Sequence, residues 1–329
     1  MRPADDGSAA PPLIAEPPPL AVELGGLRLP TPVLVASGCF GPELVQLADP
    51  RRFGGIVTRS ITMRPQRGTP SPRIAETPSG LLWDTGLQNN GIEAFLVREL
   101  PALAELGVPI LVSVAGSSID EFMRLVMALE GVPGVAAIEA NACCPSRERD
   151  GQWYAATVDG AAEVAGAVSR LARVPVFVKL AEGPQLVEVA RACVRSGATG
   201  LTLIHSPPGT AVDPATFQPR LSSVAGGVSG PAIRAMAVHA VYRVAQALPE
   251  LPILGVGGIA TGEDAVEFLL AGAGAVQVGT AVFRNPQAPV DVAMGVGRLL
   301  AERGLSSPEQ LRGRLGSLPA PAPVGPEPS

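Results

Sequence analysis

The stretch Leu251–Thr280, LPILGVGGIATGEDAVEFLLAGAGAVQVGT, contains two short, largely apolar runs on either side of a helical period. The runs are Pro252–Val256 and Ala275–Val278, and Gly or Pro residues bound both of them. Such runs are typical of strands that are buried on both faces of a parallel sheet. Between them, Glu263–Ala271 has helical spacing, and Thr261 is a suitable N-cap. The stretch therefore predicts a strand–helix–strand unit.

The same pattern repeats through the rest of the chain. Six more apolar runs predict strands, at Val33–Ser37, Gly55–Thr58, Pro109–Val114, Val135–Ala140, Val174–Lys179 and Gly200–Ile204. Further helices are predicted at Ile119–Leu129, Gly160–Leu171, Gln185–Ser196 and Ala232–Ala247, with Ser117 or Ser118 as cap of the first. Eight strands that alternate with helices predict an α/β fold, a single (β/α)8 TIM barrel, rather than an open doubly wound sheet.

Length and composition agree with one barrel flanked by tails. A chain of 329 residues is normal for this architecture, and 47% hydrophobic with 17% charged residues excludes disorder of the whole chain. Residues 1–19 and 317–329 are rich in Pro, Ala and Gly, so we expect two disordered tails around a barrel domain at 20–316.

Charge and cysteine usage exclude several classes of protein. The net charge of −5 includes no clustered basic excess, so we expect no nucleic-acid partner. No uncharged apolar run of about 18 residues occurs, and the N-terminus lacks the apolar core of a signal peptide, so we expect no membrane span. The four cysteines form no C-x-x-C pair, which argues against a metal or iron–sulfur site within the chain and suits a reducing cytoplasm.

In this architecture the active site lies where the strands end. Small and polar residues gather at the predicted strand ends: Ser37, Arg59, Ser60, Asn141, Lys179, His205 and Ser206. Gly257 and Gly258 follow the seventh strand, and Gly279 and Thr280 follow the eighth. Backbone amides at such glycines can approach a phosphate, and the segment Gly227–Gly230 could add further amides. The alternative is that these glycines only make tight turns.

Lys179 and Cys144 each have a structural and a functional interpretation. Lys179 ends a buried run, so it is either a surface lysine at a strand end or a cation that contacts an electron-rich cofactor. Cys144 lies in the loop after the fourth strand, between Cys143 and Pro145. It is either a small buried apolar residue or a catalytic thiol. The residues alone leave both choices open.

Over Leu20–Pro286 the chain resembles the soluble class 1 dihydroorotate dehydrogenases, most closely the catalytic subunit of the NAD-linked enzymes. The stretches that carry the resemblance are Leu27–Gly41 (LRLPTPVLVASGCFG), Gly55–Leu87, Gly226–Ile233 (GGVSGPAI) and Gly255–Ala281. Within the second stretch, PSPRIAETPSGLL is long and specific.

The resemblance implies an FMN-dependent oxidoreductase that converts dihydroorotate to orotate in pyrimidine biosynthesis. It implies FMN contacts at Ser37, Arg59, Ser60, Asn141, Lys179, Ile204, Gly230, Gly257, Gly258, Gly279 and Thr280. It implies substrate contacts at Arg59, Trp83, Gly86, Leu87, Asn141, Ser146, His205 and Ser206. Cys144 matches the cysteine of the family's N-x-S-C-P-N motif, so the resemblance implies that it is the catalytic base, taking a proton from C5 while the flavin takes hydride from C6.

The substrate pocket departs from the family. Trp83 and His205 stand where the family usually has asparagines that bind orotate, and Ser146 replaces the asparagine that ends the cysteine motif. Arg59 replaces a lysine and Ser113 an asparagine. Each lost amide hydrogen bond costs about 1–3 kcal/mol if its partner stays buried and unpaired. Arg59 can still hold a carboxylate, and Arg147 and Arg149 are either solvated loop charges or further carboxylate ligands.

Three functions remain open at this point. The first is a class 1-like dihydroorotate dehydrogenase, and the second is a paralogue that acts on another small cyclic acid or amide. The third is a flavin-binding, non-catalytic subunit, which the altered pocket and the Pro-rich tails motivate. The resemblance also implies a separate FAD/iron–sulfur subunit for any use of NAD, and a homodimer is compatible with it.

Overall fold

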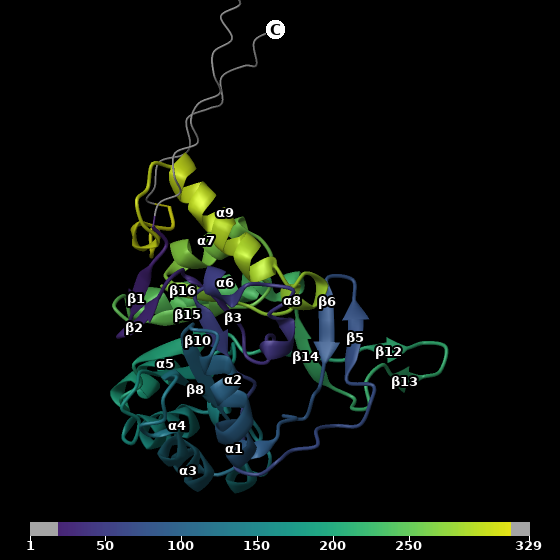
Figure 1. Ribbon diagram of the computed structural model, residues 1–329. Helices are drawn as coiled ribbons and strands as arrows, with labels where there is room; N and C mark the ends of the chain where they lie inside the picture. Colours follow the sequence, from purple (N-terminus) through teal and green to yellow (C-terminus); the bar gives the residue numbers. More distant parts are fainter. Residues whose placement is uncertain (1–18, 317–329) are drawn as a thin grey trace, which may run out of the picture.

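The computed structural model describes residues 19–316, and eight parallel strands close into a barrel within them (Figure 1). Around the barrel the strands are β3 (Val33–Val35), β4 (Gly55–Val57), β7 (Ile110–Val114), β8 (Val135–Asn141), β9 (Val176–Leu180), β10 (Gly200–Leu203), β15 (Ile253–Val256) and β16 (Ala275–Val278), and β16 pairs with β3. The predicted barrel and its eight strands are thus confirmed. Apart from Pro19, the two predicted tails lie outside the described residues.

The helices surround the barrel and lie between its strands. Their bounds are α1 (Gly91–Ala94), α2 (Leu100–Ala104), α3 (Ile119–Leu129), α4 (Val158–Ser169), α5 (Leu186–Arg195), α6 (Arg234–Ala247), α7 (Gly262–Ala271), α8 (Ala281–Arg284) and α9 (Ala288–Glu302). Ser118 caps α3 by accepting from the Glu121 N–H, and Thr261 forms a capping box with Asp264 at α7. Among residues 19–316, no helix combines the length and apolarity that a membrane span requires.

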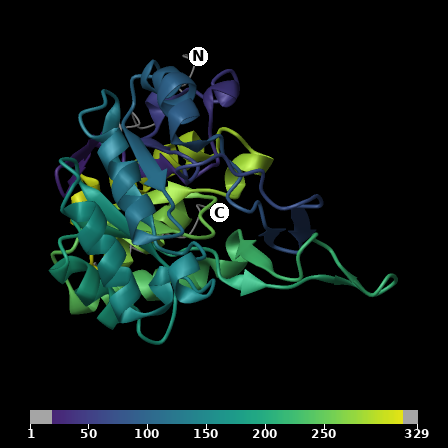
Figure 2. The ribbon, with the colours of Figure 1, turned by 90° about the horizontal axis from the view of Figure 1, so that it is seen from below.

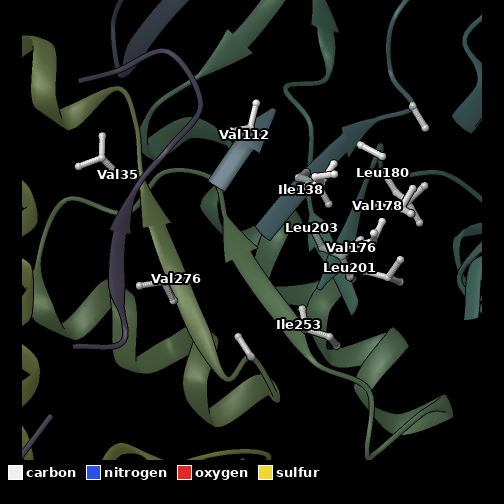
Figure 3. Packing of buried hydrophobic residues seen from close by; sticks show 14 of the residues in the cluster. Val35, Val112, Ile138, Val176, Val178, Leu180, Leu201, Leu203, Ile253 and Val276 are labelled. Atoms are coloured by element: carbon white, nitrogen blue, oxygen red, sulfur yellow. The ribbon is translucent and has the colours of Figure 1, made fainter. Parts of the chain in front are cut away.

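Apolar side chains on the outer face of the barrel pack against this layer of helices. Figure 3 shows part of the cluster, in which Val35, Val112, Ile138, Val178 and Ile253 come from different strands. Strand residues of the opposite parity point into the barrel, because successive side chains of a strand alternate between its faces. Each strand is therefore buried on both faces, which explains its apolar sequence.

A hairpin closes the amino-terminal end of the barrel. It consists of β1 (Val22–Leu24) and β2 (Leu27–Leu29), joined by Gly25 and Gly26, which both have positive φ as a tight two-residue hairpin loop requires. Its apolar side chains share a cluster with inward-facing strand residues, among them Leu34, Phe177 and Leu254. The open mouth of the barrel is therefore at the carboxyl ends of the strands.

A small antiparallel sheet extends the mouth. Its strands are β5 (Ile74–Thr77), β6 (Gly80–Trp83), β14 (Gly226–Ser229) and β11 (Pro208–Gly209), and they belong to the segments that follow β4 and β10. A hairpin of β12 (Val212–Asp213) and β13 (Gln218–Pro219) projects from the body of the molecule (Figure 2). The pairing of Trp83 with Gly227 in this sheet brings two distant segments together at the mouth.

Candidate active site

A buried charge network lies inside the barrel, one layer above the apolar residues that the hairpin covers. Lys179 Nζ is 3.7 Å from Glu139 Oε1, and the Glu139 side chain is fully buried. The other carboxylate oxygen, Oε2, accepts from Thr202 Oγ1 at 3.1 Å and from Gln277 Nε2 at 3.0 Å. These four residues come from β8, β9, β10 and β16. The network therefore fixes a lysine cation beneath the mouth.

Lys179 was predicted for this site, but Glu139 was missed. A signal for Glu139 was available, because a lone acidic residue inside the buried run Val135–Ala140 needs a partner.

Polar side chains from neighbouring strands are linked above this network. Asn141 Nδ2 donates to Ser60 Oγ at 3.1 Å, and Ser60 Oγ lies 3.0 Å from Ser113 Oγ. Asn141 Oδ1 accepts from the Cys143 N–H at 3.0 Å, which orients the amide. Ser37 Oγ donates to the Thr58 carbonyl at 2.8 Å. The structure thus brings Ser60, Asn141 and Lys179 to one face, with Ser37 on an adjacent strand.

Glycine segments converge beside the ends of β15 and β16. Gly257, Gly258 and Gly230 have φ values of 138°, 74° and 95°. A Cβ on Gly258 would lie 2.8 Å from the Gly230 carbonyl oxygen, and a Cβ on Gly230 would lie 3.5 Å from Thr280 Cγ2. The segments therefore form a close-packed backbone cradle at the place where TIM barrels often hold a phosphate.

Aromatic side chains form one wall of the mouth. His205 follows β10, and its N–H donates to the Leu180 carbonyl at 2.8 Å. Its ring lies 5.2 Å from the Trp153 ring in a T-shaped arrangement and 6.2 Å from the Trp83 ring. The Trp83 indole packs over Gly227, where an added Cβ would lie 3.2 Å from the indole ring. Trp153 was missed, although it is one of only 2 tryptophans in the chain and lies in the same loop as Cys144.

His205 is expected to stay neutral well below neutral pH. Burial and the nearby Lys179 cation lower its pKa to about 4, below the value of about 6.5 for an unperturbed histidine. The unfolded chain therefore takes up a proton first as the pH falls, so His205 destabilises the fold progressively between about pH 6.5 and 4. In His205→Gln, the free energy of unfolding should fall less over this window. An NMR titration midpoint near 6.5 for His205 would contradict the prediction.

The Cys144 thiol is covered in this structure. Its Sγ lies 3.1 Å from the Asn141 carbonyl oxygen and 3.3 Å from the Gly116 carbonyl oxygen, and its single S–H can donate to either. Burial raises the pKa of Cys144 to about 12. By contrast, Cys39 and Cys143 are close enough to Lys179 for its charge to lower their pKa values, although burial still raises both overall. The structure therefore places Cys144 after the end of β8, with its thiol against the backbone carbonyls of Asn141 and Gly116.

Ion pairs anchor this loop on the side away from the mouth. Arg147 pairs with Glu121 of α3, and Arg149 Nη2 lies 2.8 Å from Glu163 Oε2 of α4. The Ser146 hydroxyl accepts from the Glu148 N–H at 3.1 Å and donates to the Ser117 carbonyl at 3.4 Å. Of the predicted substrate ligands, Ser146 thus has a hydroxyl that is already engaged, with its own loop and with the turn before α3.

The remaining predicted residues lie around the rim. Arg59 is exposed, and its Nη1 donates to the Gln88 carbonyl at 3.3 Å. Gly86 and Leu87 form a turn with φ values of 57° and 53°, next to Gln88 in the chain. Ile204 is buried, and the side chain of His205 bonds to the Ser206 carbonyl through Nδ1 at 3.1 Å.

Comparison with known proteins identifies the relatives of this chain. The sequence model of the dihydroorotate dehydrogenase family matches residues 19–300. The catalytic subunit of dihydroorotate dehydrogenase B (NAD(+)) from Geotalea daltonii is 42% identical over 301 residues, which are 91% of this chain and 98% of that protein. The subunit of the same name from Desulforudis audaxviator is 43% identical over 296 residues, 89% of this chain and 96% of that protein.

These matches confirm the predicted class of enzyme, a dehydrogenase that acts on a CH–CH bond. They extend over the barrel, the glycine cradle and the loop that carries Cys144. The chain belongs to the dihydroorotate dehydrogenase family.

Proposed function

We propose that this chain binds FMN and oxidises dihydroorotate to orotate, as the catalytic subunit of an enzyme with a separate electron-transfer subunit. The observation that carries the proposal is the joint presence at one barrel mouth of the glycine cradle and the polar group of Lys179, Asn141 and Ser60. FMN has a phosphate at one end and a polar ring at the other, so the two features match its two ends. Gly230, Gly257, Gly258, Gly279 and Thr280 would hold the phosphate.

The residues of the chain then divide the chemistry between them. Bound FMN supplies a two-electron acceptor for the hydride that leaves C6 of the substrate. Cys144, as thiolate, takes the proton from C5, and the C5–C6 single bond becomes a double bond. Lys179 lies beneath the ring site as a fixed positive charge. Arg59 at the rim can hold the substrate carboxylate with two parallel hydrogen bonds.

The electrons leave through a partner in this proposal. The relatives are named catalytic subunits of NAD(+)-linked enzymes. This chain has no C-x-x-C pair, so we expect NAD+ reduction only when a subunit with FAD and an iron–sulfur cluster is added. The four free cysteines suit a reducing compartment, and we propose the cytoplasm. A homodimer is a further proposal that rests on the resemblance alone.

A second candidate substrate is another small cyclic acid or amide. The contact of His205 with Trp83 and Trp153 favours it, because Trp83 and His205 stand where the family has asparagine amides that would meet a pyrimidine ring. Titration of orotate against the flavin spectrum separates the two candidates. A spectral change at micromolar orotate supports dihydroorotate, whereas no change at millimolar orotate supports the second candidate.

Gly258→Ala is expected to weaken FMN binding by at least about 10-fold, which corresponds to about 1.4 kcal/mol. The new Cβ would lie 2.8 Å from the Gly230 carbonyl oxygen, at a φ of 74°, so the cradle must widen. Gly304→Ala is the matched control, because Gly304 has a similar φ of 64° and nothing within 4 Å of the added Cβ. Fluorescence of FMN titrated with apoprotein measures both affinities, and equal affinities would argue against phosphate binding here.

A further inference from the structure

The loop 144–153 connects Cys144 to the aromatic wall of the mouth. Pro145 forms an antiparallel bridge with Trp153, and the Ser146 N–H donates to the Gln152 carbonyl at 3.1 Å. The loop therefore closes on itself, with Cys144 and Trp153 at its adjoining ends. A displacement of Trp153 should therefore also displace the backbone next to Cys144.

The direction of the Trp153 side chain follows from its neighbour. Tyr154 is fully buried and packs edge-on against Phe122, with ring centroids 5.9 Å apart. The backbone at Trp153 has φ −71° and ψ 142°, a polyproline II conformation with three residues per turn, so the Trp153 and Tyr154 side chains diverge by about 120°. Because Tyr154 points into the core, Trp153 points to the mouth, where it meets His205.

His205 is a fixed partner for this contact. Its backbone N–H is bonded to β9 through the Leu180 carbonyl, and its Nδ1 donates to the Ser206 carbonyl at 3.1 Å. A neutral imidazole that donates through Nδ1 leaves Nε2 as an acceptor. Nε2 of His205 can therefore accept a hydrogen bond from an N–H of the substrate ring, while the two indoles contact that ring.

We propose that Trp153 is a specificity-determining and positioning residue. With His205 it forms part of the site for the substrate ring, and its contact with His205 holds the Cys144 loop against the mouth. The proposal rests on the function proposed above. The Trp153–His205 site would select a planar cyclic amide or imide that donates an N–H to His205. The side-chain anchors of the loop reach α3, α4 and the turn before α3, and its backbone anchor is the bond from the Ala155 N–H to the Ala142 carbonyl, so none of them contacts His205 in place of the indole. Loss of the indole should therefore loosen the loop at its Cys144 end.

The test compares Trp153→Ala and Trp153→Phe with the wild-type holoenzyme. In Trp153→Ala, the KM for dihydroorotate and the Kd for orotate should each rise at least about 10-fold, because an aromatic contact and its buried area are lost. The Kd for FMN should stay unchanged. Iodoacetamide should label Cys144 at least about 10-fold faster, as measured by peptide mass spectrometry with Cys39 as the internal reference. Trp153→Phe should restore most of both properties.

Phe217→Ala is the control, because Phe217 is 83% exposed in the turn of the β12–β13 hairpin. This variant should leave both the rate of Cys144 labelling and the Kd for orotate at the wild-type values. Unchanged Cys144 labelling or unchanged orotate affinity in Trp153→Ala overturns the proposal. A failure of the proposed function looks different, since wild-type flavin would then show no response to orotate. Barbiturate, a cyclic imide, then replaces orotate as the probe, and an unchanged barbiturate affinity overturns the proposal equally.

Discussion

Cys144→Ala is expected to lower the rate of flavin reduction by dihydroorotate by about 10²–10⁴-fold while FMN stays bound, because that is the usual contribution of a positioned general base. Stopped-flow absorbance of the flavin measures this half-reaction without the electron-transfer partner. Cys143→Ser is the matched control. Cys143 is equally buried, but its thiol donates to the Lys179 carbonyl at 3.5 Å, and a serine hydroxyl can make the same bond.

The pH dependence of the same rate tests the state of the thiol. Burial raises the pKa of Cys144 to about 12, so the thiolate is a small fraction at neutral pH. Below that pKa the fraction rises about tenfold with each pH unit, and we expect the reduction rate to rise with it between pH 6 and 9. In Cys144→Ala this slope should disappear.

A wild-type reduction rate in Cys144→Ala would place the base elsewhere. If instead neither the wild type nor Cys144→Ala reduces its flavin with dihydroorotate, the substrate assignment is wrong. The role of Cys144 is then tested in the same way with the cyclic acid or amide that does reduce the flavin. A chain that binds FMN and reduces it with no cyclic acid or amide would match the non-catalytic flavin subunit.

The barrel could be predicted from the sequence because its strands are buried on both faces. This burial imposes short apolar runs, and Gly or Pro marks their ends, as at Pro252–Val256. The sheet of β5, β6, β14 and β11 gave no such signal. Three of its four strands contain glycine, and Trp83 pairs with Gly227 across a large separation in the chain, so only tertiary contacts define it.

For the site as well, the sequence predicted some residues and missed others. Lys179 and the glycines lie at strand ends, and a barrel brings strand ends together whatever the loops do. The position of Trp153 depends on the burial of Tyr154 and on the loop bridge at Pro145, neither of which local sequence specifies. The Ser146 hydroxyl illustrates the converse. A residue matched by motif alone can have its hydrogen bonds taken up by backbone groups of its own loop and of a neighbouring turn.

Lys179→Met is expected to lower the free energy of unfolding of the apoprotein by about 3–5 kcal/mol, because it leaves Glu139 as an unpaired buried charge. The Glu139 side chain is 0% exposed and that of Lys179 11%. Urea unfolding measures the change. Arg173→Met is the control: the Arg173 side chain, which pairs with Glu130, is 87% exposed, so its loss should cost less than about 1 kcal/mol.

The double variant Glu139→Gln/Lys179→Met decides whether the effect belongs to the pair. A glutamine keeps an oxygen for Thr202 and Gln277, whose side chains bond to Glu139 Oε2, and it carries no charge. If Lys179 and Glu139 act together, the double variant should regain most of the stability that Lys179→Met loses. If the losses add instead, the two charges are independent. The carboxylate would then have a role in the barrel interior apart from holding the lysine beneath the mouth.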